Sequence, residues 1–363
     1  MKEITKEEIV AIMRTVKDPE LGKDLVTLGM LKEIKIDGAN VILDVVLTTP
    51  ACPLKDRITD DIRLAIRGNI PHVGEIKVNF DADVKSSRPM SDTNRIPGIK
   101  HVIAVGSGKG GVGKSTIAAN LALALQQEGA RVGLLDADIY GPSMGIMFGV
   151  PEGEKPKVNS ENRIMPIMRF DMPLMSMGFL IGAQEAVVWR GPMLAKMLQQ
   201  FLEQVNWGEL DYLVLDLPPG TGDVQLTLSQ LIPVSGAVIV GTPQDVAMAD
   251  VARAVKMFNM TQVPILGIVE NMSGFDCPHC HEVTRVFGGG SQDKSRYEKM
   301  NLTLLGELPL ELDTRVAGDA GAPIVVKDPQ SAQAKRFRAL AQKIAAAISV
   351  KSYESELQLP VLH

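Results

Sequence analysis

Eight consecutive residues have the types and spacing that hold phosphate groups. They are Gly108-Lys109-Gly110-Gly111-Val112-Gly113-Lys114-Ser115, and they fit the pattern of Gly, four residues, then Gly-Lys-Ser. The glycines let the backbone approach phosphate oxygens closely and turn its N–H groups toward them. Lys114 is expected to reach the terminal phosphates, and Ser115 is expected to ligate magnesium through its hydroxyl group. The pattern therefore predicts a nucleotide site.

The residues on either side of this loop have the patterns of a strand and a helix. The apolar run at 101–106 indicates a buried strand, and Thr116 opens a helical pattern that continues to Glu128. A helix that begins at the loop adds the positive end of its dipole to a phosphate site. A tight strand–helix turn is the alternative, but such a turn does not need so many glycines.

Acidic residues follow two other apolar runs of the chain. Asp136 and Asp138 come after one run, and Asp216 comes after another. Ligands of an open α/β sheet bind at the carboxyl ends of its strands, so these carboxylates are expected to face the loop. Asp216 suits magnesium binding through water, and Asp138 suits orienting the attacking water or accepting its proton. Asp136 is expected to be a buried, hydrogen-bonded strand end.

A pair of cysteines forms a second chemical centre. In Cys277-Pro278-His279-Cys280 the two thiols are three positions apart, a spacing that can grip one metal ion or one edge of an iron–sulfur cluster. Zinc is an alternative because His279 and His281 are adjacent, and an inert structural pair is another. A redox dithiol fits less well, because the pair does not open a helix after a strand.

Composition limits the class of protein. The chain has 363 residues, 45% hydrophobic and 22% charged, with a net charge of −5. It has no basic field for nucleic acid, and no stretch of about 18 apolar residues that would span a membrane. Its charged start does not resemble a secretory signal, and its three cysteines do not make a disulfide framework. We expect a cytoplasmic protein with neither nucleic-acid nor membrane partners.

The chain divides into two predicted domains. Residues 1–84 read as a small α+β domain, with a helix capped by Thr5, strands at 31–36, 41–47 and 73–80, and a second helix at 56–67. Residues 85–98 are rich in Ser, Pro and charge and read as a linker.

Residues 99–363 are predicted to form an α/β domain. Apolar runs alternate with helical patterns, which predicts a mostly parallel sheet covered by helices on both faces. The strands are expected at 131–136, 173–177, 211–216, 237–241, 265–270 and 302–305, and the helices at 192–205, 223–231, 246–260 and 331–348. The last helix is expected to pack on the sheet rather than to target a membrane, and the tail after Ser349 is expected to be mobile.

The second lysine of the loop, Lys109, is unusual at its position. The loop resembles the deviant Walker A class of MinD- and ParA-like ATPases and of the nitrogenase iron protein. In that class the extra lysine reaches across a dimer to the partner's nucleotide, which implies ATP as ligand and a homodimer. A solvated surface lysine is the alternative.

Further segments resemble the Mrp/ApbC-type iron–sulfur cluster carrier ATPases. Residues 136–143 and 216–223 resemble the switch segments of this family, and residues 270–273, 277–280, 306–310 and 318–321 fit it as well. The resemblance implies catalytic roles for Lys109, Lys114, Asp138 and Asp216. It also implies nucleotide contacts from Gly108 to Ser115, from Thr116, and from Asn271 against the adenine.

The small domain has its own resemblance. Residues 18–21 with 48–53 resemble a domain of iron–sulfur assembly factors, and Cys52 stands at that family's reactive position. A helix N-terminus would lower the pKa of this thiol; a half-buried, unreactive cysteine is the alternative.

The resemblances together imply an ATP-hydrolysing carrier of a 4Fe–4S cluster. The carrier would receive its cluster from an assembly scaffold and pass it to apo iron–sulfur proteins. A cluster of this type takes four thiolates, and one chain offers Cys277 and Cys280, so two copies are expected to share it. A MinD/ParA-like positioning ATPase and a nitrogenase-like ATP-driven reductase are the alternatives.

Overall fold

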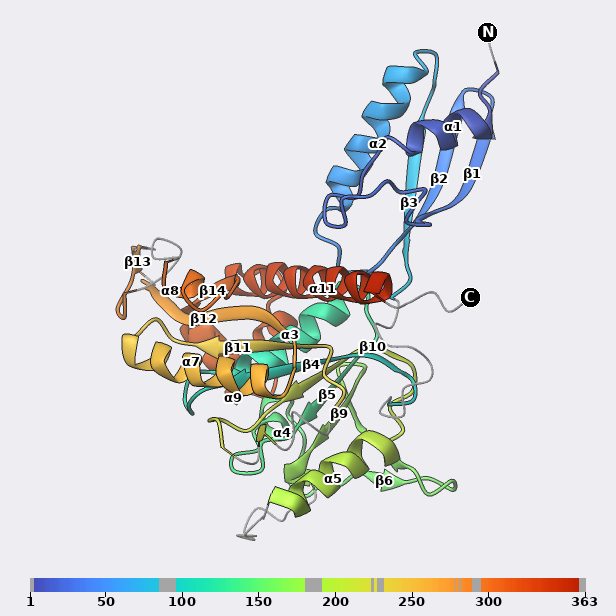
Figure 1. The fold of residues 1–363 in the computed structure, drawn as a ribbon. Helices are drawn as coiled ribbons and strands as arrows, with labels where there is room; N and C mark the ends of the chain where they lie inside the picture. Colours follow the sequence, from blue (N-terminus) through green and yellow to red (C-terminus); the bar gives the residue numbers. More distant parts are fainter. Residues whose placement is uncertain are drawn as a thin grey trace. The chain divides into compact units, whose positions relative to one another are not determined.

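The computed structural model of the chain describes residues 3–84, 96–179, 191–222, 225–226, 232–277, 279–280, 282–288 and 295–358, without the side chains of 191–195 and 355–358. The chain forms two compact units, one of Met1–Ser87 together with Ala345–His363 and one of Arg88–Ile344 (Figure 1). None of the described helices is long and apolar enough to cross a membrane.

The smaller unit is an α+β fold, as the sequence predicts. Its three strands pair in the order β1-β2-β3, with β1 antiparallel and β3 parallel to β2. The Thr5 hydroxyl oxygen accepts a hydrogen bond from the backbone N–H of Glu8 at 3.2 Å and so caps the first helix. The elements are α1 (Lys6–Met13), β1 (Leu31–Asp37), β2 (Asn40–Leu47), α2 (Lys55–Asn69) and β3 (Ile76–Ala82).

The end of the chain belongs to this smaller unit. Helix α11 (Ala332–Gln358) continues well past residue 348, where the sequence pattern placed its end, so the expectation of a mobile tail directly after Ser349 was wrong. The Lys23 ammonium lies 5.2 Å from the centre of the Tyr353 ring. From Ala345 onward, α11 therefore groups with residues 1–87 rather than with the α/β domain.

The larger unit is built on a sheet in which nine strands are described. The strand order is β13-β12-β11-β4-β10-β5-β9-β8, with β14 also paired to β12. Among the described strands, only β13 and β8, at the ends of this order, run antiparallel to their neighbours. The strands are β4 (Ile99–Ser107), β5 (Val132–Asp136), β8 (Ile167–Arg169), β9 (Met172–Ser176), β10 (Leu210–Asp216), β11 (Gly236–Gly241), β12 (Ile265–Asp276), β13 (Val283–Thr284) and β14 (Leu304–Leu310).

Both faces of this sheet are covered. All seven residues of β10 are buried, and consecutive strand residues point to opposite faces. The unit's longer helices are α3 (Lys114–Gln127), α5 (Gly191–Gln204), α7 (Asp245–Met260) and the first part of α11, and its shorter ones are α4 (Met144–Met147), α8 (Ser295–Glu298), α9 (Leu312–Asp319) and α10 (Ile324–Lys327). Side chains of α5 and α7 share one apolar cluster with the strands. The predicted α/β fold is confirmed.

The edges of the sheet differ from the sequence prediction. Strand β12 extends past Glu270 to Asp276, and β14 extends to Leu310. The predicted excursion at 151–167 contains a small hairpin of β6 (Lys157–Val158) and β7 (Ile164–Met165). Most of the predicted helix at 223–231 lies outside the described residues.

Candidate nucleotide and thiolate sites

The phosphate-type loop joins β4 to α3. Gly113 has a φ of +84°, and a Cβ there would lie 2.2 Å from the Asn271 amide nitrogen. A Cβ on Gly108 would lie 2.1 Å from the backbone oxygen of Asp250. The loop therefore needs glycine both for its backbone conformation and for its close packing.

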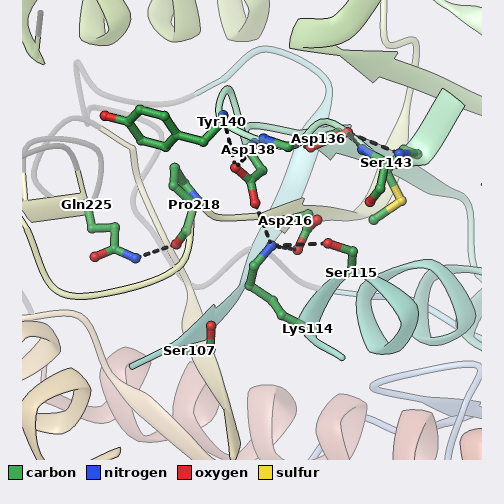
Figure 2. Close-up of polar contacts among 12 residues, drawn as sticks. Ser107, Lys114, Ser115, Asp136, Asp138, Tyr140, Ser143, Asp216, Pro218 and Gln225 are labelled. Carbon is green, nitrogen blue, oxygen red and sulfur yellow. Dashed lines mark hydrogen bonds and ion pairs between the residues drawn. The ribbon is translucent and has the colours of Figure 1, made fainter. Parts of the chain in front are cut away.

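Lys114, the first residue of α3, lies between two carboxylates (Figure 2). Its ammonium group donates a hydrogen bond to Asp216 Oδ1 at 2.5 Å, lies 3.6 Å from Asp138 Oδ2, and donates to Ser115 Oγ at 3.3 Å. The Lys114 side chain is 6% exposed. The structure thus brings together four of the residues expected to act on a nucleotide.

Asp136 is a buried, hydrogen-bonded strand end, paired in register with Asp216 on the next strand. Its Oδ1 accepts from the backbone N–H of Asp138 at 3.1 Å, and its Oδ2 accepts from the Ser176 hydroxyl at 2.9 Å. The backbone N–H groups of Ser143 and Met144 also donate to Oδ2. One carboxylate therefore holds both ends of the loop from Asp138 to Met144.

Burial and the nearby Asp216 charge raise the pKa of Asp136 to about 7. Burial also raises the pKa of Asp216, against the opposing charge of Lys114. The Asp216 Oδ2 atom is buried and has no hydrogen-bond partner among the described residues. An unpaired buried carboxylate oxygen next to the Ser115 hydroxyl fits Mg²⁺, which prefers oxygen ligands and keeps several waters.

Asp138 is held in position by the turn that follows it. Its Oδ1 accepts from the backbone N–H groups of Tyr140 and Gly141 at 3.2 and 3.3 Å. Its Oδ2 faces Lys114. The loop thereby fixes one oxygen of this carboxylate and leaves the other directed toward the phosphate-type loop.

A cavity of about 570 Å³ opens beside the loop. Lys109 lies on its wall, and Asn271 donates a hydrogen bond from its amide to the backbone oxygen of Val112 at 2.8 Å. The volume is in the range of sites for small ligands. The cavity is also lined by residues that the sequence patterns did not single out for ligand contact, among them Glu311, Thr314, Arg315, Gln333 and Phe337.

The cysteine pair lies on the hairpin formed by β12 and β13. The Cys277 backbone N–H donates to the Glu282 oxygen at 3.0 Å, which closes the hairpin. Cys277 is partly exposed and Cys280 is exposed. Hydrogen bonds from the Cys280 and His279 backbone N–H groups, and one from the Cys280 side chain, lower the pKa of Cys277. A lowered pKa favours the thiolate, the form that ligates metals.

The described residues of one chain supply few metal ligands at this hairpin. Among the described residues, no three His, Cys, Asp or Glu side chains gather where they could hold a metal ion. His281, which raised the zinc alternative, lies outside the described residues, as does Pro278.

Cys52 lies in the smaller unit, two residues before the N-cap of α2. The thiol is buried, and burial raises its pKa to about 11, with further contributions from the charges of Glu20 and Asp18. A backbone hydrogen bond from Leu54 acts in the opposite direction. Burial therefore outweighs the effect expected from the helix start.

Two families match the chain. Residues 98–345 match the family described as NUBPL iron-transfer P-loop NTPase. Residues 6–78 match the family described as iron-sulfur cluster assembly protein.

Two relatives match this chain over nearly its whole length. An iron-sulfur cluster carrier protein of Deinococcus radiodurans is 48% identical over 356 residues, covering 98% of this chain and 99% of the relative. A protein of the same name from Synechocystis sp. is 46% identical over 350 residues, covering 96% and 99%.

Solved structures resemble the larger unit. A nucleotide-binding protein from Archaeoglobus fulgidus, in complex with ADP, is 40% identical with a TM-score of 0.57, and the match covers 67% of this chain and 94% of that one. The cell division ATPase MinD of Pyrococcus furiosus is 22% identical with a TM-score of 0.51, covering 67% and 98%, which is a similarity of fold. Together with the family match over more than half of the residues, these similarities show that the chain belongs to the NUBPL-type iron-transfer P-loop NTPases, as the resemblance of its motifs predicts.

Proposed function

We propose that this protein is an ATP-hydrolysing carrier that binds an iron–sulfur cluster through Cys277 and Cys280 and transfers it to apo iron–sulfur proteins. The observation that carries the proposal is the presence, in one compact unit, of a lysine–carboxylate nucleotide site and an accessible cysteine pair in which the pKa of Cys277 is lowered. Relatives named as iron-sulfur cluster carriers support the carrier role, and a similar protein solved with ADP supports nucleotide binding.

The ATP-binding steps follow from the side chains of the loop. Lys114 exchanges part of its contact with Asp216 and Asp138 for the terminal phosphates when ATP enters. Ser115 and Asp216 would hold Mg²⁺, which would supply positive charge at the terminal phosphates. Asp138 orients the attacking water, and the backbone N–H groups of the loop bind phosphate oxygens. We assign Asn271 to the adenine, because its amide offers both a donor and an acceptor to a base edge.

A homodimer completes the cluster site in this proposal. A 4Fe–4S cluster takes four cysteine thiolates, and two chains related by a twofold axis supply four from their paired hairpins. Apolar side chains around the hairpin are exposed, namely Phe275, Val283, Val286, Phe287 and Leu310. Such a surface suits contact with a second copy. In the same dimer, Lys109 reaches across to the partner's nucleotide.

The proposed setting is the cytoplasm, where thiols stay reduced. The three cysteines are free in the structure. The cluster is received from an assembly scaffold, and turnover of ATP is slow because hydrolysis times loading or release.

The test is anaerobic reconstitution of the purified chain with iron and sulfide, followed by spectroscopy and transfer to an apo iron–sulfur protein. About four irons and four sulfides per dimer are expected. Zinc that iron and sulfide do not replace would refute the carrier. Electron transfer without cluster transfer would favour the reductase alternative, and failure to bind any metal would favour a positioning ATPase.

A further inference from the structure

The guanidinium group of Arg336, on α11 within the larger unit, touches both the cysteine hairpin and the wall of the nucleotide cavity. We propose that Arg336 is a positioning residue that couples the occupancy of the nucleotide cavity to the state of the Cys277–Cys280 pair. The inference rests on the proposed function for the biological role of the cysteine pair, but the contacts of Arg336 do not depend on that function.

On the hairpin side, Arg336 holds Asp276. The Asp276 Oδ2 atom accepts from both Nη1 and Nη2 of Arg336, each at 3.2 Å. Asp276 is the last residue of β12 and directly precedes Cys277. A change in this contact therefore acts on the backbone that carries the first thiol.

On the nucleotide side, the same guanidinium holds Glu311 and Gln333. Arg336 Nη1 donates to Glu311 Oε1 at 3.0 Å and to Gln333 Oε1 at 3.3 Å. The Gln333 amide in turn donates to the backbone oxygen of Pro309 at 3.2 Å. Pro309, Glu311 and Gln333 all line the cavity, so a ligand there bears on residues that Arg336 binds directly.

The backbone between the two sites is irregular. Asn271 and Asp276 belong to the same strand, but the pairing of β12 with β14 slips between Asn271 and Phe275. Met272 has a φ of +55°, in the left-handed region that a non-glycine residue seldom adopts. Because β12 is irregular between its cavity-lining residue Asn271 and Asp276, the contacts of Arg336 with Glu311 and Asp276 give a second connection between the cavity wall and the hairpin.

Arginine suits this role better than lysine. Its planar fork binds several acceptors in fixed directions, whereas an ammonium is a point charge on a flexible stem. Here one cation serves two carboxylates, and the Asp276 and Glu311 side chains are only 26% and 19% exposed. A shift of Glu311 on nucleotide binding therefore alters the charge balance at Asp276.

Such coupling is reciprocal. If a nucleotide changes the affinity of the cysteine pair for its cargo, the cargo changes the affinity for the nucleotide by the same factor.

The test measures the alkylation rates of Cys277 and Cys280 in the full-length chain by site-resolved mass spectrometry, without nucleotide and with saturating Mg-ADP or Mg-ATP. We expect nucleotide to change the rate about fivefold or more, and Arg336→Gln to reduce the change to less than about twofold. Arg338→Gln is the matched control, because Arg338 lies on the same helix and, within the described part of the chain, its side chain donates to the Pro329 carbonyl at 3.0 Å and to neither site; it should keep the full response.

Glu311→Gln tests the same link if Arg336→Gln fails to fold, since it weakens only the contact on the nucleotide side. Rates that ignore nucleotide in the unmodified chain, or an unchanged response in both variants, would overturn the coupling. A chain that takes up a cluster but shows no nucleotide response refutes this inference alone. A chain that takes up no cluster yet shows an Arg336-dependent response refutes the carrier function alone.

Discussion

At the scale of single residues, the ammonium group of Lys114 dominates the electrostatics of the nucleotide site. It compensates Asp216, which is fully buried, and lies near Asp138. A buried carboxylate without its cation is costly, so this contact serves the fold as well as the ligand.

We expect Lys114→Ala to abolish productive ATP binding and to lower the free energy of unfolding by about 3–5 kcal/mol, because Asp216 is left buried and unpaired. Nucleotide titration and denaturant unfolding measure the two effects. Lys109→Ala is the comparison: ATP binding should persist, while hydrolysis should fall because the proposed target of Lys109 is the partner's nucleotide. Normal turnover in Lys109→Ala would mean that this lysine is a surface residue.

The two carboxylates beside Lys114 should differ in their variants. Asp138→Asn is expected to slow hydrolysis about a hundredfold with little loss of binding, as for a group that orients or deprotonates water. Asp216→Asn should weaken the magnesium dependence instead. Single-turnover hydrolysis over a magnesium titration separates them, and normal hydrolysis by both variants would contradict the assignments.

Asp136 should make stability depend on pH. Its pKa is raised from 3.8 to about 7 in the folded chain, so the folded state holds this proton more tightly. Stability from this group is complete at low pH and is lost as pH rises from about 4 to about 7. Asp136→Asn should therefore flatten the fall in unfolding free energy between about pH 5 and about pH 8.

Asp211 serves as a control because its pKa is lowered in the folded chain, whereas that of Asp136 is raised. Burial raises its pKa, but hydrogen bonds from Arg131 and Lys100 outweigh burial and lower it. Asp211→Asn should lower the free energy of unfolding by the same amount at about pH 5 and at about pH 8. The fall in unfolding free energy between these two pH values should therefore stay as it is in the parent chain. An Asp136→Asn variant with the same pH slope as the parent chain would show that another group is responsible.

At the scale of elements, the strands buried on both faces were the most predictable. The residues at 102–106, 132–135 and 212–215, which precede Ser107, Asp136 and Asp216, are continuously apolar because both faces of the sheet are covered. The ends of the outer strands were harder to predict, because the end of β12 mixes polar and apolar residues and its pairing with β14 slips. The phosphate-type loop was readable because its residues are consecutive. The contacts of Arg336 were not, since they join residues 25 and 60 positions away in sequence.

Gly113→Ala should disturb the loop and the strand next to it together. The new Cβ would lie 2.2 Å from the Asn271 amide nitrogen at a φ of +84°, so Asn271 must leave the Val112 oxygen. We expect nucleotide affinity to fall about tenfold or more, with a backbone cost of about 1–2 kcal/mol. Gly153→Ala separates the two causes, since its φ is +82° and nothing lies within 4 Å. It should cost stability alone; equal loss of affinity in both variants would refute the Asn271 clash.

At the scale of the whole molecule, the effect of replacing a cysteine should depend on the unit in which that cysteine lies. Cys277→Ala or Cys280→Ala should abolish the reconstituted cluster and weaken the dimer, because each thiolate is proposed as a ligand. Cys52→Ala should leave the cluster in place, since Cys52 is buried in the smaller unit. Iron and sulfide analysis with light scattering measures both outcomes. A cluster that survives the loss of Cys277 would remove the carrier function.

The membership of the last helical segment has a consequence for biosynthesis. The smaller unit contains both residues 1–87 and the chain from Ala345 onward, so the two parts leave the ribosome about 260 residues apart, on the order of tens of seconds at bacterial elongation rates of ~5–20 residues per second. The buried residues of its apolar core cluster lie within residues 4–76 and are translated early, whereas the segment from Ala345 onward follows the larger unit. The smaller unit therefore begins to emerge before the larger unit and is completed only after the larger unit has been translated.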